Sequence, residues 1–207
     1  MKTPGFSIII VTWNGLHLLK KFLPSVLATE YADFEVIIAE NNSKDGSQQW
    51  LEANHPDVKV VALDDNYGYC GGNNRAVAHA DKEILLFLNN DVHVHKHWLS
   101  NLAPVFSDAD VAAAQPKMKA EESPKHFEYA GACGGYLDKL GYPFCRGRVM
   151  DHLEVDEGQY DLLTDIFWAS GAALAVRKEV FTDLDGFDED FEFHMEEIYL
   201  CCRIQNL

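Results

Sequence analysis

Short apolar runs alternate with amphipathic stretches along the first part of the chain. The runs are rich in branched and aromatic residues and predict strands at Ser7–Val11, Phe34–Ile38, Val58–Leu63 and Ile84–Leu88. The stretches between them predict helices over Leu16–Leu27, Ser47–Ala53 and Gly68–Ala80, the last of which opens in a glycine-rich turn. Pro24 is expected to kink or restart the first helix. Alternating strands and helices of this kind predict an α/β fold built on a mostly parallel sheet.

The pattern becomes less regular after Asp91. It predicts a helix over Trp98–Phe106, a weak strand over Val111–Ala114, a loop-rich segment over Lys119–Thr164, a strand over Phe167–Arg177 and a helix over Glu196–Gln205. The last helix reaches Leu207 without a cap or a stop signal, so we expect a chain truncated at its C-terminus. Because no repeat, low-complexity tract or linker divides residues 1–207, we expect a single domain.

The chain is acidic, with 33 aspartates and glutamates against 17 lysines and arginines and a formal net charge of −16. This balance opposes binding to nucleic acid, because contacts to phosphate need lysine and arginine. It also means that a phosphate-bearing ligand would need a divalent cation to supply local positive charge. The five cysteines show no CxxC spacing, so we expect reduced thiols and a cytoplasmic location.

Polar side chains follow each of the predicted parallel strands. Right-handed crossovers bring the carboxyl ends of such strands to one edge of the sheet, where α/β proteins bind ligands. The groups around Thr12, Glu40–Ser43, Asp64–Asn66 and Asn89–Asp91 are therefore expected to converge. Asn89 and Asp91 offer hard oxygen ligands for an Mg²⁺ or Mn²⁺ ion that bridges phosphate oxygens, although an Asn/Asp turn explains the same residues.

Two further motifs are open to both a ligand-binding and a structural interpretation. Glu40–Ser47 can bind a pyrimidine base or a ribose, or can form an Asx turn in which Asp45 or Ser47 caps the next helix. Gly68–Arg75 can hold the anionic groups of a nucleotide at a helix N-terminus, or can be a helix start that needs left-handed glycines. It lacks the GxGxxG pattern and follows the third strand, which argues against a Rossmann dinucleotide site.

Two adjacent carboxylates, Glu196 and Glu197, open the last predicted helix. They complement the helix dipole there, which is a purely structural role. In a partly dry cleft, a carboxylate has a raised pKa and can act as a general base that takes a proton from a hydroxyl. Both interpretations fit the sequence.

Taken together, these segments resemble family 2 glycosyltransferases with the GT-A fold, and look like the bacterial rhamnosyltransferase-like members. The matching pieces occur in the family's order and are Ile10–Gly15, Ala39–Ser47, Asn66–Asn74, Leu88–Val92, Ser170–Ala172 and Gly186–Phe191 leading to Glu196 and Glu197. The resemblance implies a GT-A domain with a mixed, mostly parallel central sheet flanked by helices. Residues 1–92 would form the half that binds the nucleotide sugar, and residues 93–207 the acceptor and catalytic half.

The resemblance also implies roles for individual residues. Thr12, Glu40 and Asn41 would line the nucleoside pocket, and Asp91 with Asn89 would hold a divalent metal, Mg²⁺ or Mn²⁺, against the donor diphosphate. Further donor contacts are expected from Asn14, Asn42, Asp45, Gly71, Asn74 and Asn90. Glu197, or its neighbour Glu196, would deprotonate the acceptor hydroxyl. The sugar would be transferred in one in-line displacement that inverts the anomeric centre.

Three positions depart from the family's pattern. Asn89 replaces the first carboxylate of the DxD metal motif, Glu197 stands where the family has an aspartate, and Tyr199 replaces a later acid. These departures leave a non-catalytic sugar-nucleotide-binding domain as one alternative. A sugar-1-phosphate nucleotidyltransferase is another, although the loop Thr12–Gly15 lacks the basic residues that hold a triphosphate in that class.

The expected activity is therefore metal-assisted, inverting transfer of a hexose or deoxyhexose from a nucleoside-diphosphate sugar to a glycan or lipid-linked acceptor. The resemblance also implies a role in the synthesis of bacterial cell-surface polysaccharides. A segment beyond Leu207 is expected to carry acceptor or membrane contacts, which would give peripheral association with the inner face of the membrane. No nucleic-acid partner is expected.

Overall fold

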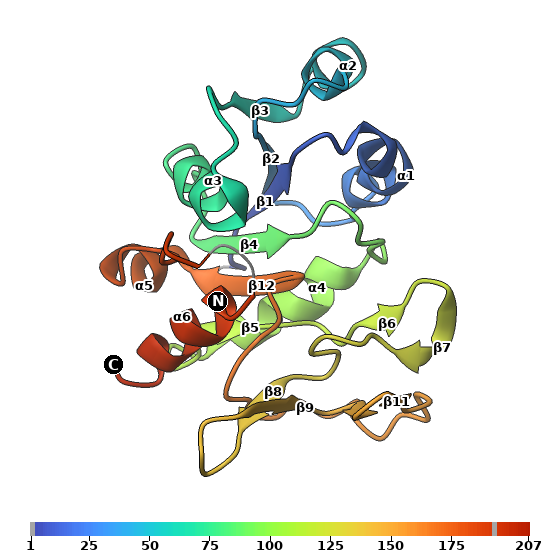
Figure 1. Ribbon diagram of the computed structural model, residues 1–207, viewed down its shortest axis with the longest axis vertical. Helices are drawn as coiled ribbons and strands as arrows, with labels where there is room; N and C mark the ends of the chain where they lie inside the picture. Colours follow the sequence, from blue (N-terminus) through green and yellow to red (C-terminus); the bar gives the residue numbers. More distant parts are fainter. Residues whose placement is uncertain (1–2, 192–193) are drawn as a thin grey trace.

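Within residues 3–191 and 194–207, which the computed structural model describes, a six-stranded sheet forms the centre of the molecule (Figure 1). Its strands lie in the order β3 (Lys59–Ala62), β2 (Phe34–Glu40), β1 (Phe6–Thr12), β4 (Ile84–Leu88), β12 (Ala173–Arg177) and β5 (Ala113–Ala114). The first four of these are mutually parallel, whereas β12 runs antiparallel to β4 and to β5. The predicted mixed, mostly parallel sheet is confirmed.

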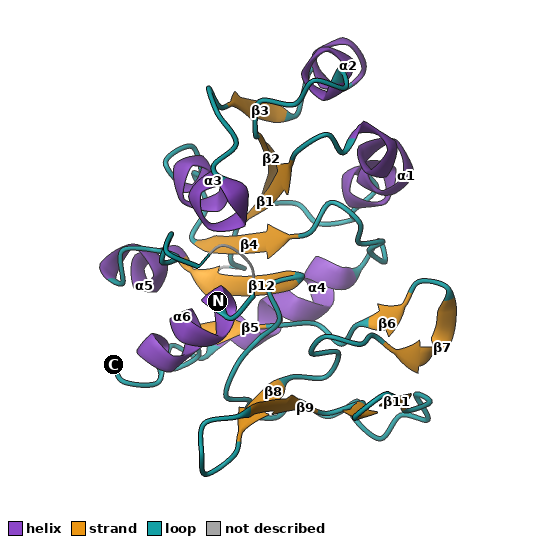
Figure 2. Ribbon diagram, in the orientation of Figure 1, coloured by secondary structure: helices purple, strands orange, loops and turns teal. Residues whose placement is uncertain are grey.

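Helices cover both faces of this sheet (Figure 2). One layer contains α1 (Leu16–Leu27), α2 (Ser47–Asn54), α4 (Trp98–Leu102) and the short 3-10 helix η1 (Ala103–Ser107), and the other contains α3 (Gly68–Val77), α5 (Lys178–Asp183) and α6 (Glu196–Ile204). Successive side chains of a strand point to opposite faces, so Ile8 and Ile10 of β1 pack against the first layer and Ile9 against the second. Burial on both faces explains why these strands are continuous apolar runs in the sequence.

Two helices differ from their predictions. Helix α1 continues through Pro24 without the restart that the sequence allowed, and a kink there stays a prediction. Pro24 and Lys20, whose carbonyl loses its helical partner to the proline, are both exposed residues. Helix α3 starts at Gly68 itself, so the predicted glycine-rich turn is the first part of the helix. Gly68 has a φ of 66°, the left-handed conformation for which glycine is suited, while Gly72 packs closely against Val11 and Asn41.

The segment between β5 and β12 forms three small hairpins at the lower end of the molecule in Figure 1. They pair β6 (Lys119–Ala120) with β7 (Ser123–Phe127), β8 (Gly135–Leu137) with β9 (Pro143–Cys145), and β10 (Arg148–Val149) with β11 (His152–Leu153). The strand predicted over Phe167–Arg177 is shorter, because the amides of Phe167 and Trp168 bond to the Gly135 carbonyl instead of a neighbouring strand of the sheet. Helix α5, directly after β12, was not predicted.

Candidate active site

The carboxyl ends of β1, β2 and β4 meet at one edge of the sheet, as the parallel topology predicts. The backbone amide of Asn41 donates to the Thr12 carbonyl at 2.9 Å, and the side chain of Asn90 donates to Thr12 Oγ1 at 3.2 Å. Gly15 allows this close approach, since a Cβ there would lie 2.5 Å from Thr12 Oγ1 and 2.7 Å from Asn90 Nδ2. Thr12, Asn41 and Asn90 are therefore brought together, with Gly15 as the residue that makes room for them.

The loops after β1 and β2 are tied to each other by residues that the sequence assigned to the donor. The backbone amide of Asn14 donates to Ser43 Oγ at 2.8 Å, and its side-chain Oδ1 accepts from the backbone amide of Lys44 at 2.8 Å. The N-cap residue of α2 is Gly46, so neither Asp45 nor Ser47 occupies that position as predicted. The Asp45 carboxylate nevertheless accepts from the Leu16 backbone amide at 2.8 Å and from Ser47, and so binds the first amides of both α1 and α2. Partial burial opposes ionisation of Asp45, but these hydrogen bonds outweigh it and hold the pKa of its carboxyl below the usual range.

Glu40 and Asn42 shape the second of these loops from within. Both oxygens of the buried Glu40 carboxylate accept from the Ser43 amide, at 3.0 and 3.2 Å. Asn42 donates to the Asp64 carbonyl at 2.8 Å and adopts a φ of 56°. The Asx-turn interpretation of this segment therefore describes its local structure, and any donor contact by Glu40 or Asn42 is made by a side chain that already holds the loop.

Asn41 is different, because the oxygen of its side-chain amide has no hydrogen-bond partner among the described residues. Its Nδ2 donates to the Gly68 carbonyl at 2.9 Å, whereas its buried Oδ1 has no hydrogen-bond partner among the described residues. A Cβ on Gly72 would lie 3.2 Å from this oxygen, so the absence of a side chain at Gly72 keeps space open there. A buried acceptor without a partner is costly, and it is suited to a donor group on a ligand.

The strand end after β4 carries the residues assigned to the metal. The backbone amide of Asn89 donates to the Ala172 carbonyl at 3.1 Å, which links this strand end to the segment that enters β12. The side chain of Asp91 is exposed. Within residues 3–191 and 194–207 there is no group of three or more histidine, cysteine, aspartate or glutamate residues placed to hold a metal ion.

Glu196 and Glu197 lie at the same edge of the sheet, beside Gly171, the residue that precedes the hydrogen-bonded Ala172. A Cβ on Gly171, which precedes Ala172, would lie 3.7 Å from Glu196 Oε1 and 3.7 Å from Glu197 Cβ. Both Oε2 atoms are buried and have no hydrogen-bond partner among the described residues. Burial raises the pKa of the Glu197 carboxyl, and the adjacent Glu196 carboxylate adds to the shift. The pair thus forms a desolvated acidic site, as a general base requires.

The backbone before this pair is in an uncommon conformation. His194 and Met195 have φ values of 66° and 76°, in the left-handed region that side chains with a Cβ rarely adopt. Strain of this kind is retained where the surrounding structure enforces it, and it is concentrated at functional sites. Here it sets the direction in which α6 begins and therefore where Glu196 and Glu197 point.

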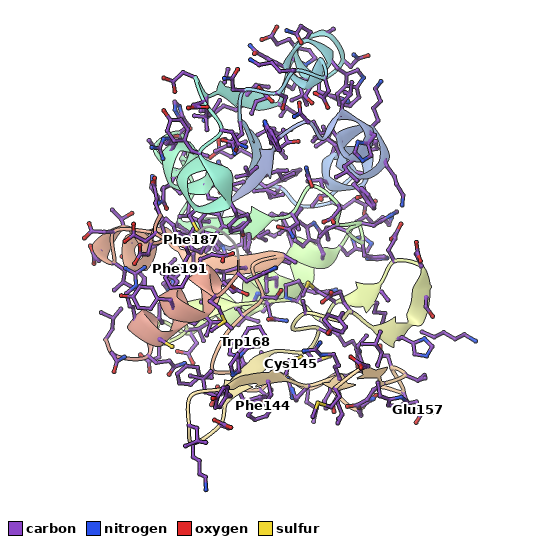
Figure 3. All side chains as sticks on the ribbon, in the orientation of Figure 1. Phe144, Cys145, Glu157, Trp168, Phe187 and Phe191 are labelled. Carbon is purple, nitrogen blue, oxygen red and sulfur yellow. The ribbon has the colours of Figure 1, made fainter. Side chains whose placement is uncertain are left out.

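Helix α3 holds the loop that precedes α6. Asn74 donates to the Phe187 carbonyl at 2.8 Å and accepts from the Phe187 amide at 3.0 Å. Arg75 pairs with Glu189 at 3.0 Å and donates to the Gly71 carbonyl, and a Cβ on Gly71 would lie 2.9 Å from the Arg75 guanidinium. Figure 3 shows Phe187 and Phe191 of this loop between α3, α5 and α6. The structure thus places Gly71 and Asn74 where α3 meets the loop that leads to the carboxylates.

Tyr69 is a site residue that the sequence analysis missed. Its hydroxyl donates to the Gly171 carbonyl at 2.7 Å, across 102 positions of the chain. Burial, together with the charges of Glu196 and Glu197, raises the pKa of Tyr69 well above its usual range, so it remains a neutral donor. No local pattern around Tyr69 indicates this contact, because it exists only once α3, β12 and α6 are packed together.

Comparisons with known proteins agree with this architecture. A model of the family described as Glycosyl transferase family 2 matches residues 7–179. The O-antigen biosynthesis protein RfbC of Myxococcus xanthus is 31% identical over 209 residues, which cover 98% of this chain but only 16% of RfbC. The N-acetylglucosaminyl-diphospho-decaprenol L-rhamnosyltransferase of Mycobacterium tuberculosis is 25% identical over 227 residues, covering 98% of this chain and 71% of that protein.

A solved structure supports the fold. The mannosyltransferase PcManGT from Pyrobaculum calidifontis, in complex with GDP-Man and Mn²⁺, superposes with a TM-score of 0.68 at 18% identity, over 99% of this chain and 52% of that one. The predicted GT-A architecture is confirmed. None of the helices in the described ranges has the length and apolar character needed to cross a bilayer.

Proposed function

Because this chain belongs to glycosyl transferase family 2, we propose that it transfers a sugar from a nucleoside-diphosphate sugar to a hydroxyl of a glycan or lipid-linked acceptor. The observation that carries the proposal is the position of Glu197. A desolvated carboxylate with a raised pKa lies beside the Gly171–Ala172 segment, which is hydrogen-bonded to the β4 strand end that carries Asn89 and Asp91. In this proposal, the proton acceptor and the residues that would hold a phosphate-bound cation share one edge of the sheet.

On the donor side, we propose that the nucleoside binds over the ends of β1 and β2. Thr12 and Asn41 form the floor, and the free Oδ1 of Asn41 accepts a hydrogen bond from the base or ribose. The network of Asn14, Glu40, Asn42 and Asp45 keeps the surrounding loops in place. Residues 1–92 would thus serve the donor, and residues 93–207 the acceptor.

The side-chain oxygens at the end of β4 fit a divalent metal that arrives with the diphosphate of the sugar nucleotide. Mg²⁺ is commonly held by one or two carboxylates together with substrate phosphates, and Asp91, with Asn89 beside it, offers one carboxylate and one amide. When bound there, the metal supplies positive charge to the departing diphosphate. The exposed position of Asp91 leaves room for both the ion and the phosphates.

In the proposed reaction, the Glu197 carboxylate removes the proton of the acceptor hydroxyl while that oxygen attacks the anomeric carbon. The bond from this carbon to the diphosphate oxygen breaks, and its electron pair leaves with the nucleoside diphosphate. Attack and departure on opposite faces invert the anomeric centre. Tyr69 positions Gly171 and so maintains the packing around the carboxylates.

We also propose that the protein works in the cytoplasm, at the inner face of the membrane. All five cysteines are free, which is typical of a reducing compartment. An acceptor carried on a lipid would bring the reaction to a membrane surface.

Calorimetry with UDP, dTDP and GDP, each with and without Mn²⁺, tests the donor site. We expect one of these to bind more tightly with Mn²⁺, and Asp91→Ala to remove that difference. Failure of all three to bind would contradict the proposal. Metal-dependent binding without release of nucleoside diphosphate from the matching sugar nucleotides would instead favour the non-catalytic binding domain.

Glu197→Gln tests the general base, with Glu196→Gln as its matched control. Loss of a positioned general base lowers turnover by about 10²- to 10⁴-fold, and binding of the nucleoside diphosphate is expected to change less than about twofold. Turnover should fall as the pH drops through the raised pKa of Glu197, because the base acts only when it is ionised. Full activity of Glu197→Gln together with loss in Glu196→Gln would transfer the role to Glu196.

A further inference from the structure

The hairpins at the lower end of the molecule expose apolar side chains. Leu140, in the turn between β8 and β9, is 73% exposed, and Met150, in the turn between β10 and β11, is 86% exposed. Tyr142, Phe144 and Val149 are also more than half exposed. A soluble protein rarely exposes large apolar side chains in a cluster unless they contact something.

These side chains belong to an ordered structure. Asp138 Oδ1 accepts from the amides of Leu140 and Tyr142, at 2.8 and 2.9 Å, and so fixes the turn from which they project. Along β9, Phe144 is exposed whereas Cys145 is buried in the same core cluster as Trp168. Figure 3 shows this alternation, with Phe144 at the outer edge of the hairpin and Cys145 between it and Trp168.

The same stretch is the basic part of an acidic chain. The two hairpins, residues 135–153, carry three basic residues, Lys139, Arg146 and Arg148, against two acids, Asp138 and Asp151, so they are net positive in a chain whose formal net charge is −16. None of these three residues forms an ion pair with the described part of the chain. Arg146 and Arg148 lie over the rings of Tyr160 and Tyr129, at 4.9 and 3.8 Å from the ring centroids, and Lys139 is exposed in the turn.

We propose that the β8–β9 and β10–β11 hairpins dock on an anionic phospholipid bilayer. Leu140, Tyr142 and Phe144 would enter the headgroup region, where aromatic and aliphatic side chains are favoured, and Lys139 would pair with lipid phosphate. Basic residues near the surface add attraction to anionic lipids. Figure 1 shows both hairpins at the same end of the long axis, furthest from β3, so one surface can meet both turns.

The shape and charge of this region favour a bilayer over a protein partner. The exposed apolar side chains are divided between two hairpins, in their turns and on β9 and β10, whereas a stable protein interface buries a contiguous patch of about 800 Å² on each partner. The rest of the chain carries 31 acids against 14 lysines and arginines and is repelled by an anionic surface, so approach is favoured through the two hairpins, residues 135–153. This inference stands independently of the proposed transferase activity, because it uses none of the strand-end residues.

Sedimentation with vesicles tests the proposal. We expect the protein to bind phosphatidylcholine vesicles that contain about one-third phosphatidylglycerol, and to bind pure phosphatidylcholine much more weakly. The double variant Leu140→Ser/Phe144→Ser should lower the partition coefficient at least about tenfold, since it removes the inserted apolar area. Lys139→Glu should lower it less, and added salt should weaken binding of the unmodified protein.

Matched variants control for non-specific effects. Leu207→Ser changes an equally exposed leucine outside the hairpins, and Lys125→Glu makes the same charge change on β7; both should bind vesicles as the unmodified protein does. An unchanged thermal midpoint shows that the double variant is folded, and unchanged nucleoside diphosphate binding separates this test from that of the donor site. The proposal is overturned if the unmodified protein does not bind anionic vesicles, if Leu207→Ser loses as much binding as the double variant, or if light scattering shows a dimer that the double variant abolishes.

Discussion

In residues 3–92 the strands share one sheet and lie between two layers of helices, whereas in residues 115–168 they are two to five residues long and pair as hairpins outside that sheet. The first region has a continuous apolar interior, with Ile8, Ile9, Ile37 and Leu86 fully buried. The second is held by particular contacts, such as those of Gly135 with Trp168 and of Lys117 with Asp156.

The difference teaches where the information for each region lies. Helices and strands that bury a continuous face repeat that face in the sequence, so the first region is readable from periodicity. Single contacts between distant residues leave no periodic trace, so the second region reads only as loop. We expect substitutions to separate the two regions, because one depends on area buried and the other on individual contacts.

The largest expected effect is in the sheet. Leu86→Ala removes a fully buried side chain from β4 and should lower the free energy of unfolding by about 2–5 kcal/mol, measured by urea denaturation. Leu140→Ala, which changes an exposed leucine in the hairpin region, should alter it by less than about 0.5 kcal/mol. Equal losses in the two variants would show that the hairpins are as much a part of the core as the sheet is.

The next effect concerns the contact between β8 and Trp168. In Gly135→Ala the new Cβ would lie 1.7 Å from Trp168 Cε2, so the strand must move, and a loss of about 1–3 kcal/mol in unfolding free energy is expected. Gly141→Ala is the control, because its φ of 84° is strained by a Cβ but no atom lies within 4 Å. A free energy of unfolding in Gly135→Ala equal to that of the unmodified protein would mean that Trp168 yields without cost.

Asp156 offers a pH-dependent test of the hairpin region. Hydrogen bonds from Lys119 and Lys117 hold the pKa of its nearly buried carboxyl well below the usual range. A lowered pKa adds stability that is complete above the pKa of the unfolded chain, about 3.9, and is lost as the pH falls below it. Asp156→Asn should therefore cost about 1–2 kcal/mol at neutral pH, and urea denaturation should show this difference narrowing below about pH 4. If Asp156→Asn lowers the free energy of unfolding equally at neutral pH and below about pH 4, the charge of Asp156 is excluded as the origin of the loss.

The smallest expected effect is at Asp45, whose carboxylate accepts from the first backbone amides of α1 and α2. Asp45→Ala should lower the free energy of unfolding by about 1 kcal/mol, whereas Asp57→Ala, at an exposed aspartate of the same region, should have little effect. Calorimetry of the same variants measures nucleoside diphosphate binding. If Asp45→Ala weakens binding severely without destabilising the fold, Asp45 contacts the donor directly rather than through the loops.

Much of the donor side could be predicted from the sequence. The strands, their parallel order and the meeting of Thr12, Asn41 and Asn90 at one edge follow from apolar runs joined by right-handed crossovers. The resemblance to family 2 glycosyltransferases directed attention to Glu196 and Glu197, and the structure adds their burial and free oxygens. Tyr69, Gly15 and the clamp of Asn74 on Phe187 were missed, because each depends on a neighbour that is close only in the folded chain.

The sequence by itself determined the α/β class, the strands of the parallel region and the family, because burial on both faces of a sheet requires continuous apolar runs and strand ends require polar turns. Only the tertiary structure decided which polar side chains have hydrogen-bond partners within the described part of the protein and which do not. Asn14 and Asp45 hold loops, while Asn41 Oδ1 and the buried Oε2 atoms of Glu196 and Glu197 have no partner among the described residues. The physical reason is that hydrogen bonding and desolvation depend on three-dimensional neighbours, which the order of residues along the chain does not specify locally.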